Sequence, residues 1–252
     1  LVDGAACTGC ERCGGACMAR QAGPQVAALS EVGRDLSASR LCTIEQVGQD
    51  RFARKSCLHC LEPACVAACL VGGLTKTEQG PVLYDRDTCI GCRYCMLACP
   101  HHVPRYEWDR QLPYVRKCDL CWDRLQQGEI PACVEACPSQ ALHFGDRDAL
   151  LVKAHDLVLS HRSRYLPRVW GEHERGGTSV LFISDVDLAS LDFPDPATPA
   201  IPSLTDPLIE KTPVMGAGVG VGLGALATIL NRRNTVLAAT QLAHHAVLDA
   251  GA

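Results

Sequence analysis

The spacing of its cysteines limits most strongly what this chain can fold into. The 252 residues include 17 cysteines, and all but Cys42 fall into four groups of four. The first and third quartets read C-x2-C-x2-C-x3-C, the second C-x2-C-x4-C-x3-C and the fourth C-x2-C-x11-C-x3-C. In chain order they are Cys7, Cys10, Cys13 and Cys17; Cys57, Cys60, Cys65 and Cys69; Cys89, Cys92, Cys95 and Cys99; and Cys118, Cys121, Cys133 and Cys137. Such close spacings are poor for disulfide staples and favour metal ligation by every quartet.

Prolines after two of the quartets narrow the choice of metal. Pro100 and Pro138 follow the third and fourth quartets, although no proline follows Cys17 or Cys69. C-x2-C-x2-C-x3-C-P is the bacterial ferredoxin signature, in which three thiolates bind one cubane and the fourth binds its neighbour. Zinc ribbons use paired C-x2-C claws and need no third cysteine three residues on. The pattern therefore predicts four [4Fe–4S] clusters, and a structural zinc protein is the weaker alternative.

Charge and the other residue types exclude several functions. The formal net charge is −4, so no basic patch indicates a nucleic-acid partner. No Ser–His–Asp or paired-carboxylate constellation stands out, and we predict a chain without catalysis of its own. Cys42 is interpreted as a small buried hydrophobic residue. Arg93, Arg105 and Lys117 lie near quartets, where a cation would raise a cluster's potential; ordinary surface charges are the alternative.

Segments around the quartets resemble the four-cluster ferredoxin-type iron–sulfur subunits of membrane respiratory oxidoreductases. This group includes the beta subunits of membrane-bound formate dehydrogenase and dimethyl sulfoxide reductase-type enzymes, and the iron–sulfur subunit of hydrogenase-2-type [NiFe] hydrogenases. Tyr165–Ser184 looks most like the hydrogenase-2 type, whereas the eleven-residue gap between Cys121 and Cys133 is closer to the formate dehydrogenase type. The other segments that carry the resemblance are Asp87–Pro100 (DTCIGCRYCMLACP), Lys117–Cys121 (KCDLC), Pro131–Pro138 (PACVEACP) and Ala141–Leu150 (ALHFGDRDAL).

The resemblance implies that the quartets exchange their last ligands, the first with the fourth and the second with the third. The four resulting cluster sites are numbered here as follows. Site 1 takes Cys7, Cys10, Cys13 and Cys137; site 2 takes Cys57, Cys60, Cys65 and Cys99; site 3 takes Cys89, Cys92, Cys95 and Cys69; and site 4 takes Cys118, Cys121, Cys133 and Cys17. Each site would hold one [4Fe–4S] cluster, in two intertwined ferredoxin-like modules.

The resemblance also implies the function and the partners. The chain is expected to relay electrons between a catalytic oxidoreductase subunit and an integral membrane subunit that reacts with quinone. The catalytic partner would be a [NiFe] hydrogenase or a molybdopterin enzyme. A free-standing polyferredoxin that serves several enzymes is an alternative function.

Outside the quartets, local patterns predict a few regular elements. The runs Pro81–Tyr84, Ala141–Phe144 and Thr178–Ser184 are typical of short strands. Apolar residues at helical spacing predict a helix over Asp146–Ser160, with Asp146 near its N-terminus. Phe193–Pro213 holds six prolines and predicts an extended linker that is not helical.

One uncharged run near the C-terminus predicts a membrane anchor. Val214–Leu230 has 17 residues without a charge, which as a helix spans ~25 Å against ~30 Å for a bilayer core. A buried helix of a soluble protein is the alternative. Lys211 precedes the run and Arg232–Arg233 follow it, so the positive-inside rule predicts a cytoplasmic C-terminus and a cluster domain on the periplasmic side of the inner membrane.

Together these patterns predict an α+β protein of four parts. Residues 1–189 form the ferredoxin-like domain, 190–213 a proline-rich extended linker, 214–230 a single transmembrane helix in contact with lipid, and 231–252 an unassigned tail.

Overall fold

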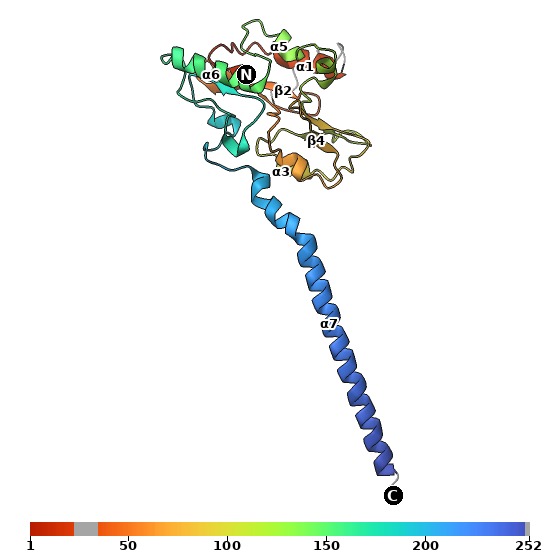
Figure 1. Cartoon of the computed structure of the whole chain (residues 1–252). Helices are drawn as coiled ribbons and strands as arrows, with labels where there is room; N and C mark the ends of the chain where they lie inside the picture. Colours follow the sequence, from red (N-terminus) through yellow and green to blue (C-terminus); the bar gives the residue numbers. More distant parts are fainter. Residues whose placement is uncertain (23–34, 250–252) are drawn as a thin grey trace. The chain divides into compact units, whose positions relative to one another are not determined.

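Two units make up the chain. The computed structural model describes residues 1–22 and 35–249, with the backbone alone for 241–249. The first unit is Leu1–Pro202 and the second is Ser203–Ala252. The first contains all four quartets and many short elements, and the second is one continuous helix as far as Asp249 (Figure 1). This mixture of helices and strands confirms the predicted α+β class.

Short strands pair two by two in the first unit. β2 (Cys42–Gly48) and β3 (Arg51–Ser56) form an antiparallel hairpin whose register shifts between Gln46 and Gly48. The other pairs are β1 (Val2–Asp3) with β8 (Phe182–Ile183), which is parallel, and the antiparallel pairs β4 (Leu74–Lys76) with β5 (Val82–Tyr84) and β6 (Arg105–Tyr106) with β7 (Val115–Arg116). Strands of two or three residues cannot hold a sheet by themselves, so side-chain packing and the loops between strands must hold this unit together.

Among the described residues of the first unit, most helices are also short. α1 (Arg12–Ala22) and α6 (Arg147–Ser160) run for several turns. The others are α2 (Ala64–Ala67), α3 (Tyr94–Ala98), α4 (Trp122–Gln126) and α5 (Ala132–Glu135), with 3-10 turns at Glu174–Gly176 and Ala189–Leu191. Prolines 63 and 131 precede α2 and α5, and proline suits a helix start because it lacks the N–H that would be unpaired there.

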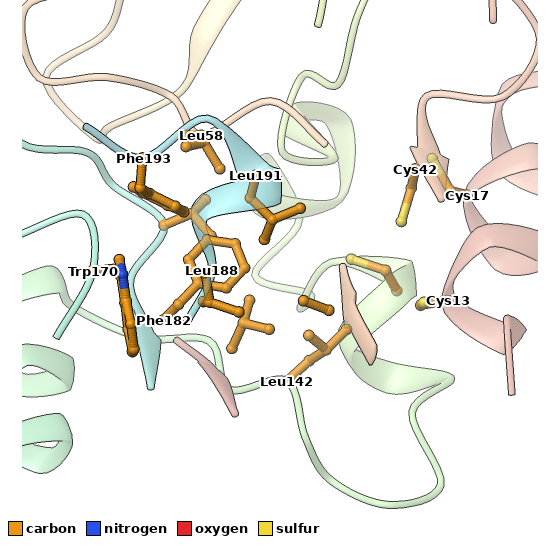
Figure 2. Packing of buried hydrophobic residues seen from close by; sticks show 14 of the residues in the cluster. Cys13, Cys17, Cys42, Leu58, Leu142, Trp170, Phe182, Leu188, Leu191 and Phe193 are labelled. Atoms are coloured by element: carbon orange, nitrogen blue, oxygen red, sulfur yellow. The ribbon is translucent and has the colours of Figure 1, made fainter. Parts of the chain in front are cut away.

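Buried side chains form separate hydrophobic clusters. One joins Trp170 and Phe182 to cysteines of the first and fourth quartets, and Figure 2 shows Cys13 and Cys17 on the opposite side from these aromatic rings. A second lies between α6 and β8, and a third, which includes Val82, involves cysteines of the second and third quartets. The first and third clusters thus contain cysteines of different quartet pairs, whereas the second contains no cysteine.

Two of the predicted strands are shorter than expected. Pro81–Tyr84 becomes β5, as predicted. Thr178–Ser184 is almost entirely buried but forms ladder pairs only at Phe182–Ile183. The predicted strand over Ala141–Phe144 is reduced to one antiparallel bridge, between Leu142 and Val2. A partner strand of two residues is too short to pair with more of that run.

The predicted helix after Gly145 is confirmed as α6. Asp146 is its N-cap, and one carboxylate oxygen accepts hydrogen bonds from the N–H groups of Asp148 (3.0 Å) and Ala149 (3.1 Å). These bonds satisfy two donors that the first helical turn leaves unpaired.

Removing this cap should loosen the start of α6. We expect Asp146→Ala to cost about 1 kcal/mol, and hydrogen exchange of amides near the start of the helix to become about fivefold faster. Asp146→Asn keeps an acceptor and serves as the control, with near wild-type exchange. Equal exchange in the alanine variant and the wild type would show that packing, not the cap, fixes this end.

The second unit corrects the prediction of an extended linker. α7 runs over Ile201–Asp249 and contains Pro207 and Pro213, so the extended prediction for Phe193–Pro213 is wrong from Ile201 onward. Pro202 lies in the first turn, where no helical hydrogen bond is lost. Pro207 and Pro213 each remove one hydrogen bond, and five residues lie between them, so helical turns remain on both sides of each proline.

α7 contains the predicted anchor. Within the described residues, the segment Ile201–Thr240 is the one helix long and apolar enough to cross a membrane, and its apolar window is fully exposed in the chain. The predicted span Val214–Leu230 lies inside it, and the helix continues through most of the tail to Asp249. The last residues, 250–252, lie outside the described part.

Candidate metal centres

Every quartet bends its backbone in the same way just before its second cysteine. Left-handed backbone costs a residue with a side chain about 1–2 kcal/mol, whereas glycine adopts it freely. In the second and fourth quartets this position is not glycine, so the loop imposes a backbone conformation that the residue itself disfavours. The residues and their φ angles are Gly9 (70°), His59 (49°), Gly91 (72°) and Leu120 (57°).

This bend aims a backbone donor at the first sulfur of the quartet. Gly91 N–H donates to Cys89 Sγ, and Leu120 N–H donates to Cys118 Sγ, both at 3.4 Å. Hydrogen bonds of this kind stabilise thiolates and tune the potentials of clusters that they bind.

The third and fourth cysteines of each quartet are separated by one helical turn. α1 carries both Cys13 and Cys17. α2, α3 and α5 each carry the third cysteine and end one or two residues before the fourth. Helical residues four apart share a face but are displaced by about 6 Å along the axis. The two thiols of such a pair can thus serve neighbouring sites.

The four thiols assigned to site 1 line one small cavity. Its lining includes Cys7, Cys10 and Cys13 of the first quartet together with Cys137 of the fourth. Burial raises the pKa of the Cys7 thiol, the backbone N–H of Gly9 opposes that rise, and the sulfurs of Cys137 and Cys10 add to it. The fold thus brings the last cysteine of the fourth quartet to the loop of the first.

The thiols assigned to site 4 are also neighbours. Burial raises the pKa of Cys17, and the sulfurs of Cys42, Cys133 and Cys121 raise it further. Burial likewise raises the pKa of Cys118, which lies near Cys17 and Cys133. The last cysteine of the first quartet therefore lies among the cysteines of the fourth.

The thiols assigned to site 2 form a third group. Burial raises the pKa of Cys65, and the sulfurs of Cys57, Cys99 and Cys60 raise it further. Burial also raises the pKa of Cys60 to about 12, with added contributions from Cys57 and Cys99. Cys99 belongs to the third quartet by sequence, so this group again draws its last member from another quartet.

The thiols assigned to site 3 complete the pattern. Burial raises the pKa of Cys95 to about 11, and the sulfurs of Cys89, Cys92 and Cys69 raise it further. Ile90, between Cys89 and Cys92 of this site, is 64% exposed. Site 3 thus borders the surface through an apolar side chain.

Electrostatic contacts between sulfurs also connect the groups. Cys13 of site 1 lies near Cys133 of site 4, and Cys118 of site 4 lies near Cys57 of site 2. Cysteines of sites 2 and 3 share one hydrophobic cluster. These contacts connect the thiols assigned to site 1 with those of site 4, those of site 4 with those of site 2, and those of site 2 with those of site 3.

The chemistry of the donors fits iron–sulfur ligation. All 17 cysteines are free thiols, and cysteine thiolates are the ligands of [4Fe–4S] clusters. Within the described residues, no three His, Cys, Asp or Glu side chains converge closely enough to hold a single metal ion.

Buried cations lie among the sulfurs, and one of them was predicted. Lys117 is 6% exposed, donates to the backbone oxygens of Val82 and Cys118, and opposes the rise in the pKa of Cys65. By contrast, the predicted cation Arg93 is exposed and stacks over the rings of Tyr106 and Trp108. The third, Arg105, is half-buried and donates to the backbone oxygen of Leu36 at 2.8 Å.

Sequence reasoning missed Arg54 and the partner of Cys42. Cys42 is completely buried, as predicted, but it also accepts a hydrogen bond from Arg54 Nε at 3.2 Å. Burial would lower the pKa of Arg54, but the sulfurs of Cys42, Cys133, Cys118 and Cys13 raise it well above its ordinary value. The signal available in the sequence was the β-type hairpin pattern around Gly48–Asp50, which places Cys42 and Arg54 on paired strands.

Comparisons with known proteins agree with this donor chemistry. The family model of the 4Fe-4S dicluster domain matches residues 49–147. A protein of Nitratidesulfovibrio vulgaris (strain Hildenborough) is 35% identical over 96% of this chain and 69% of its own length. The hydrogenase-2 operon protein HybA of Escherichia coli O157:H7 is 36% identical over 73% of this chain and 64% of its own length. The B subunit of anaerobic dimethyl sulfoxide reductase of Escherichia coli K12 is 39% identical over 63% of this chain and 78% of its own length.

Proposed function

Because this chain belongs to the 4Fe-4S dicluster family that includes HybA, the B subunit of dimethyl sulfoxide reductase and the iron–sulfur subunit of formate dehydrogenase, we propose that it is the electron-transfer subunit of a membrane-bound respiratory oxidoreductase. It passes electrons between a catalytic subunit, a [NiFe] hydrogenase or a molybdopterin enzyme, and a quinone-reactive membrane subunit.

The crossed grouping of the thiols is the observation that carries this proposal. Four cysteine groups, each with three members from one quartet and one from another, supply the donors for four [4Fe–4S] clusters at sites 1 to 4. Exchange of the last ligand between neighbouring clusters is the arrangement of two-cluster ferredoxins. Two such exchanges make the two modules, with sites 1 and 4 in one and sites 2 and 3 in the other.

The contacts between groups support a linear relay. When bound, a [4Fe–4S] cluster takes up and releases single electrons, and the protein sets its spacing, solvent access and potential. Cys13 and Cys133 bring sites 1 and 4 together, and Cys118 and Cys57 bring sites 4 and 2 together. Site 3, whose loop carries the exposed side chain of Ile90 between Cys89 and Cys92, would then be one terminus of the relay.

α7 would fix the relay at the inner membrane. Its uncharged run Val214–Leu230 spans the lipid, and Arg232–Arg233 lie on the cytoplasmic side by the positive-inside rule. The cluster domain then faces the periplasm, and the helix is available to the quinone-reactive subunit.

Metal analysis of the intact complex tests this function. The complex is solubilised anaerobically in mild detergent through a tag on this chain, and iron, nickel, molybdenum, tungsten and zinc are measured against protein. We expect four irons for each of the four sites, together with nickel or with molybdenum or tungsten from the catalytic partner.

Other outcomes separate the alternatives. Iron without any co-purifying catalytic metal would favour a free-standing polyferredoxin. Zinc at about one atom per quartet, with little iron, would overturn the electron-transfer function altogether.

A further inference from the structure

A buried arginine lies at the centre of the β2–β3 hairpin. Arg54 is 6% exposed and pairs with Ile44 across the hairpin. Its Nε donates to Cys42 Sγ at 3.2 Å in a buried hydrogen bond. Among the described residues, no carboxylate forms an ion pair with it. A buried charge without a counter-charge is costly, so the surroundings of Arg54 must supply negative charge in another form.

The surroundings of Arg54 are two of the proposed cluster sites. It lines the same small cavity as all four thiols assigned to site 1. It also lines a second cavity together with Cys133 of site 4. Cys13 of site 1 and Cys133 of site 4 belong to one hydrophobic cluster, which also includes Ala53, the residue before Arg54. One cation therefore borders both sites of the module.

Cys42, the cysteine outside the quartets, holds this cation in place. It is fully buried, and its sulfur is within hydrogen-bonding reach of Cys13. Figure 2 shows Cys42 beside Cys17 and Cys13, with its sulfur pointing into the same region. Its pairing with Ser56 at the open end of the hairpin fixes its backbone. Cys42 thus connects the guanidinium of Arg54 to the ligand shell without belonging to a site.

We propose that Arg54, anchored by Cys42, is the fixed charge that raises the reduction potentials of the clusters at sites 1 and 4 together. This inference rests on the proposed function. A [4Fe–4S] cluster with four thiolates is anionic, and each electron taken up adds negative charge. A guanidinium does not lose its proton in proteins, and in a buried setting its attraction is weakly screened. It therefore favours the reduced form at both sites.

Redox titration of the intact complex, followed by electron paramagnetic resonance, tests this role. Arg54→Gln removes the charge, Arg54→Lys retains it, and dithionite supplies the electrons. In Arg54→Gln we expect two of the four clusters to become harder to reduce. At the wild-type midpoint potential of each of these two clusters, the ratio of reduced to oxidised cluster should fall at least tenfold. This fall is equivalent to a lowering of the midpoint potential by about 59 mV for one electron. The other two midpoints should stay unchanged, and Arg54→Lys should restore most of the shift.

A neighbouring arginine gives the matched control. Arg51 lies on the same strand, but its side chain is 42% exposed and forms an ion pair with Asp185 at 2.5 Å. Arg51→Gln removes the same charge, and the four midpoints should not move because solvent and the carboxylate already screen it.

Cys42→Ala provides a second, independent variant. It leaves the charge of Arg54 but removes its acceptor, so the same two midpoints should shift in the same direction, with full iron content. If Arg54→Gln loses iron, this variant decides the outcome. Unchanged midpoints in the variants that keep their iron would overturn the role of Arg54, and loss of iron in Cys42→Ala would overturn the role of Cys42 as a non-ligand. Absence of iron from the wild type would instead refute the proposed function.

Discussion

Replacing Cys7 and Cys137 together is expected to remove no more iron than replacing either one alone. These residues belong to the first and fourth quartets, yet both line the cavity of site 1. If they bind one cluster, either single alanine variant loses that cluster, and the second substitution has nothing left to remove. Residues that act as one unit show this non-additivity.

The matched double variant reverses the expectation. Cys133 and Cys137 lie in the same quartet, the first within α5 and the second two residues beyond its end, but the proposal assigns them to sites 4 and 1. Replacing both should remove two clusters, about eight irons per chain instead of about four. Iron per purified chain and the integrated spectrum of the reduced protein measure both double variants.

Electron transfer in the same variants should fall with the iron. Loss of any one site interrupts a linear relay, so quinone reduction by the complex should drop by more than the ~10–100-fold that substitutions of outer-shell metal partners cause. If the Cys7/Cys137 double variant loses two clusters and the Cys133/Cys137 variant loses one, the ligands are not exchanged between quartets.

A single charge in the middle of α7 should detach this chain from the membrane. Leu223 lies near the centre of the uncharged run and is 62% exposed. An arginine at the centre of a membrane span costs about 2.5–3.5 kcal/mol of insertion free energy, on the order of a hundredfold in the inserted population. We therefore expect Leu223→Arg, expressed without its partner subunits, to leave the membrane fraction.

Leu204 supplies the matched control for this variant. It lies on the same helix, is 67% exposed, and precedes the uncharged run. Leu204→Arg adds the same charge where an arginine lies at or outside the interface, so membrane association should persist. The measurement is the share of tagged chain that sediments with washed membranes. Equal retention of both variants, and of a chain that ends at residue 202, would show that α7 is not the anchor.

The two experiments are independent. The cysteine variants test the first unit, Leu1–Pro202, and the arginine variants test the second, Ser203–Ala252. A chain with intact sites and no anchor would still bind iron, and a chain with a broken site would still reach the membrane. Their results thus separate the relay from its attachment.

Local sequence patterns were sufficient to predict several elements of this protein. Four features could be predicted from residues that are close together in the sequence. They are the cysteine quartets, the helix that begins after Asp146, the strand ending at Tyr84 and the uncharged run of α7. Ligand spacing, capping and hydrophobic length are properties of such short segments. For that reason they were readable without any tertiary contact.

Where local patterns were ambiguous, the sequence misled. Prolines argued for extended chain up to Pro213, but the helix begins at Ile201, because the hydrogen bonds of the intervening turns outweigh two missing ones. The run Ala141–Phe144 has the residues of a strand, yet its neighbour offers a single bridging residue, Val2. Strand formation depends on a partner that the segment itself does not contain.

Only the tertiary structure brings together side chains that lie far apart in the sequence. Cys7 and Cys137 meet although most of the first unit lies between them in sequence, and Arg54 reaches the sulfurs only because the hairpin folds β3 back along β2. The spacing of the cysteines determines the local geometry of each loop, but it contains no information on which distant loop will pack against it. Such long-range contacts form when buried side chains pack the loops together. The loss of conformational entropy on ordering the loops is offset only by the contacts of the complete fold.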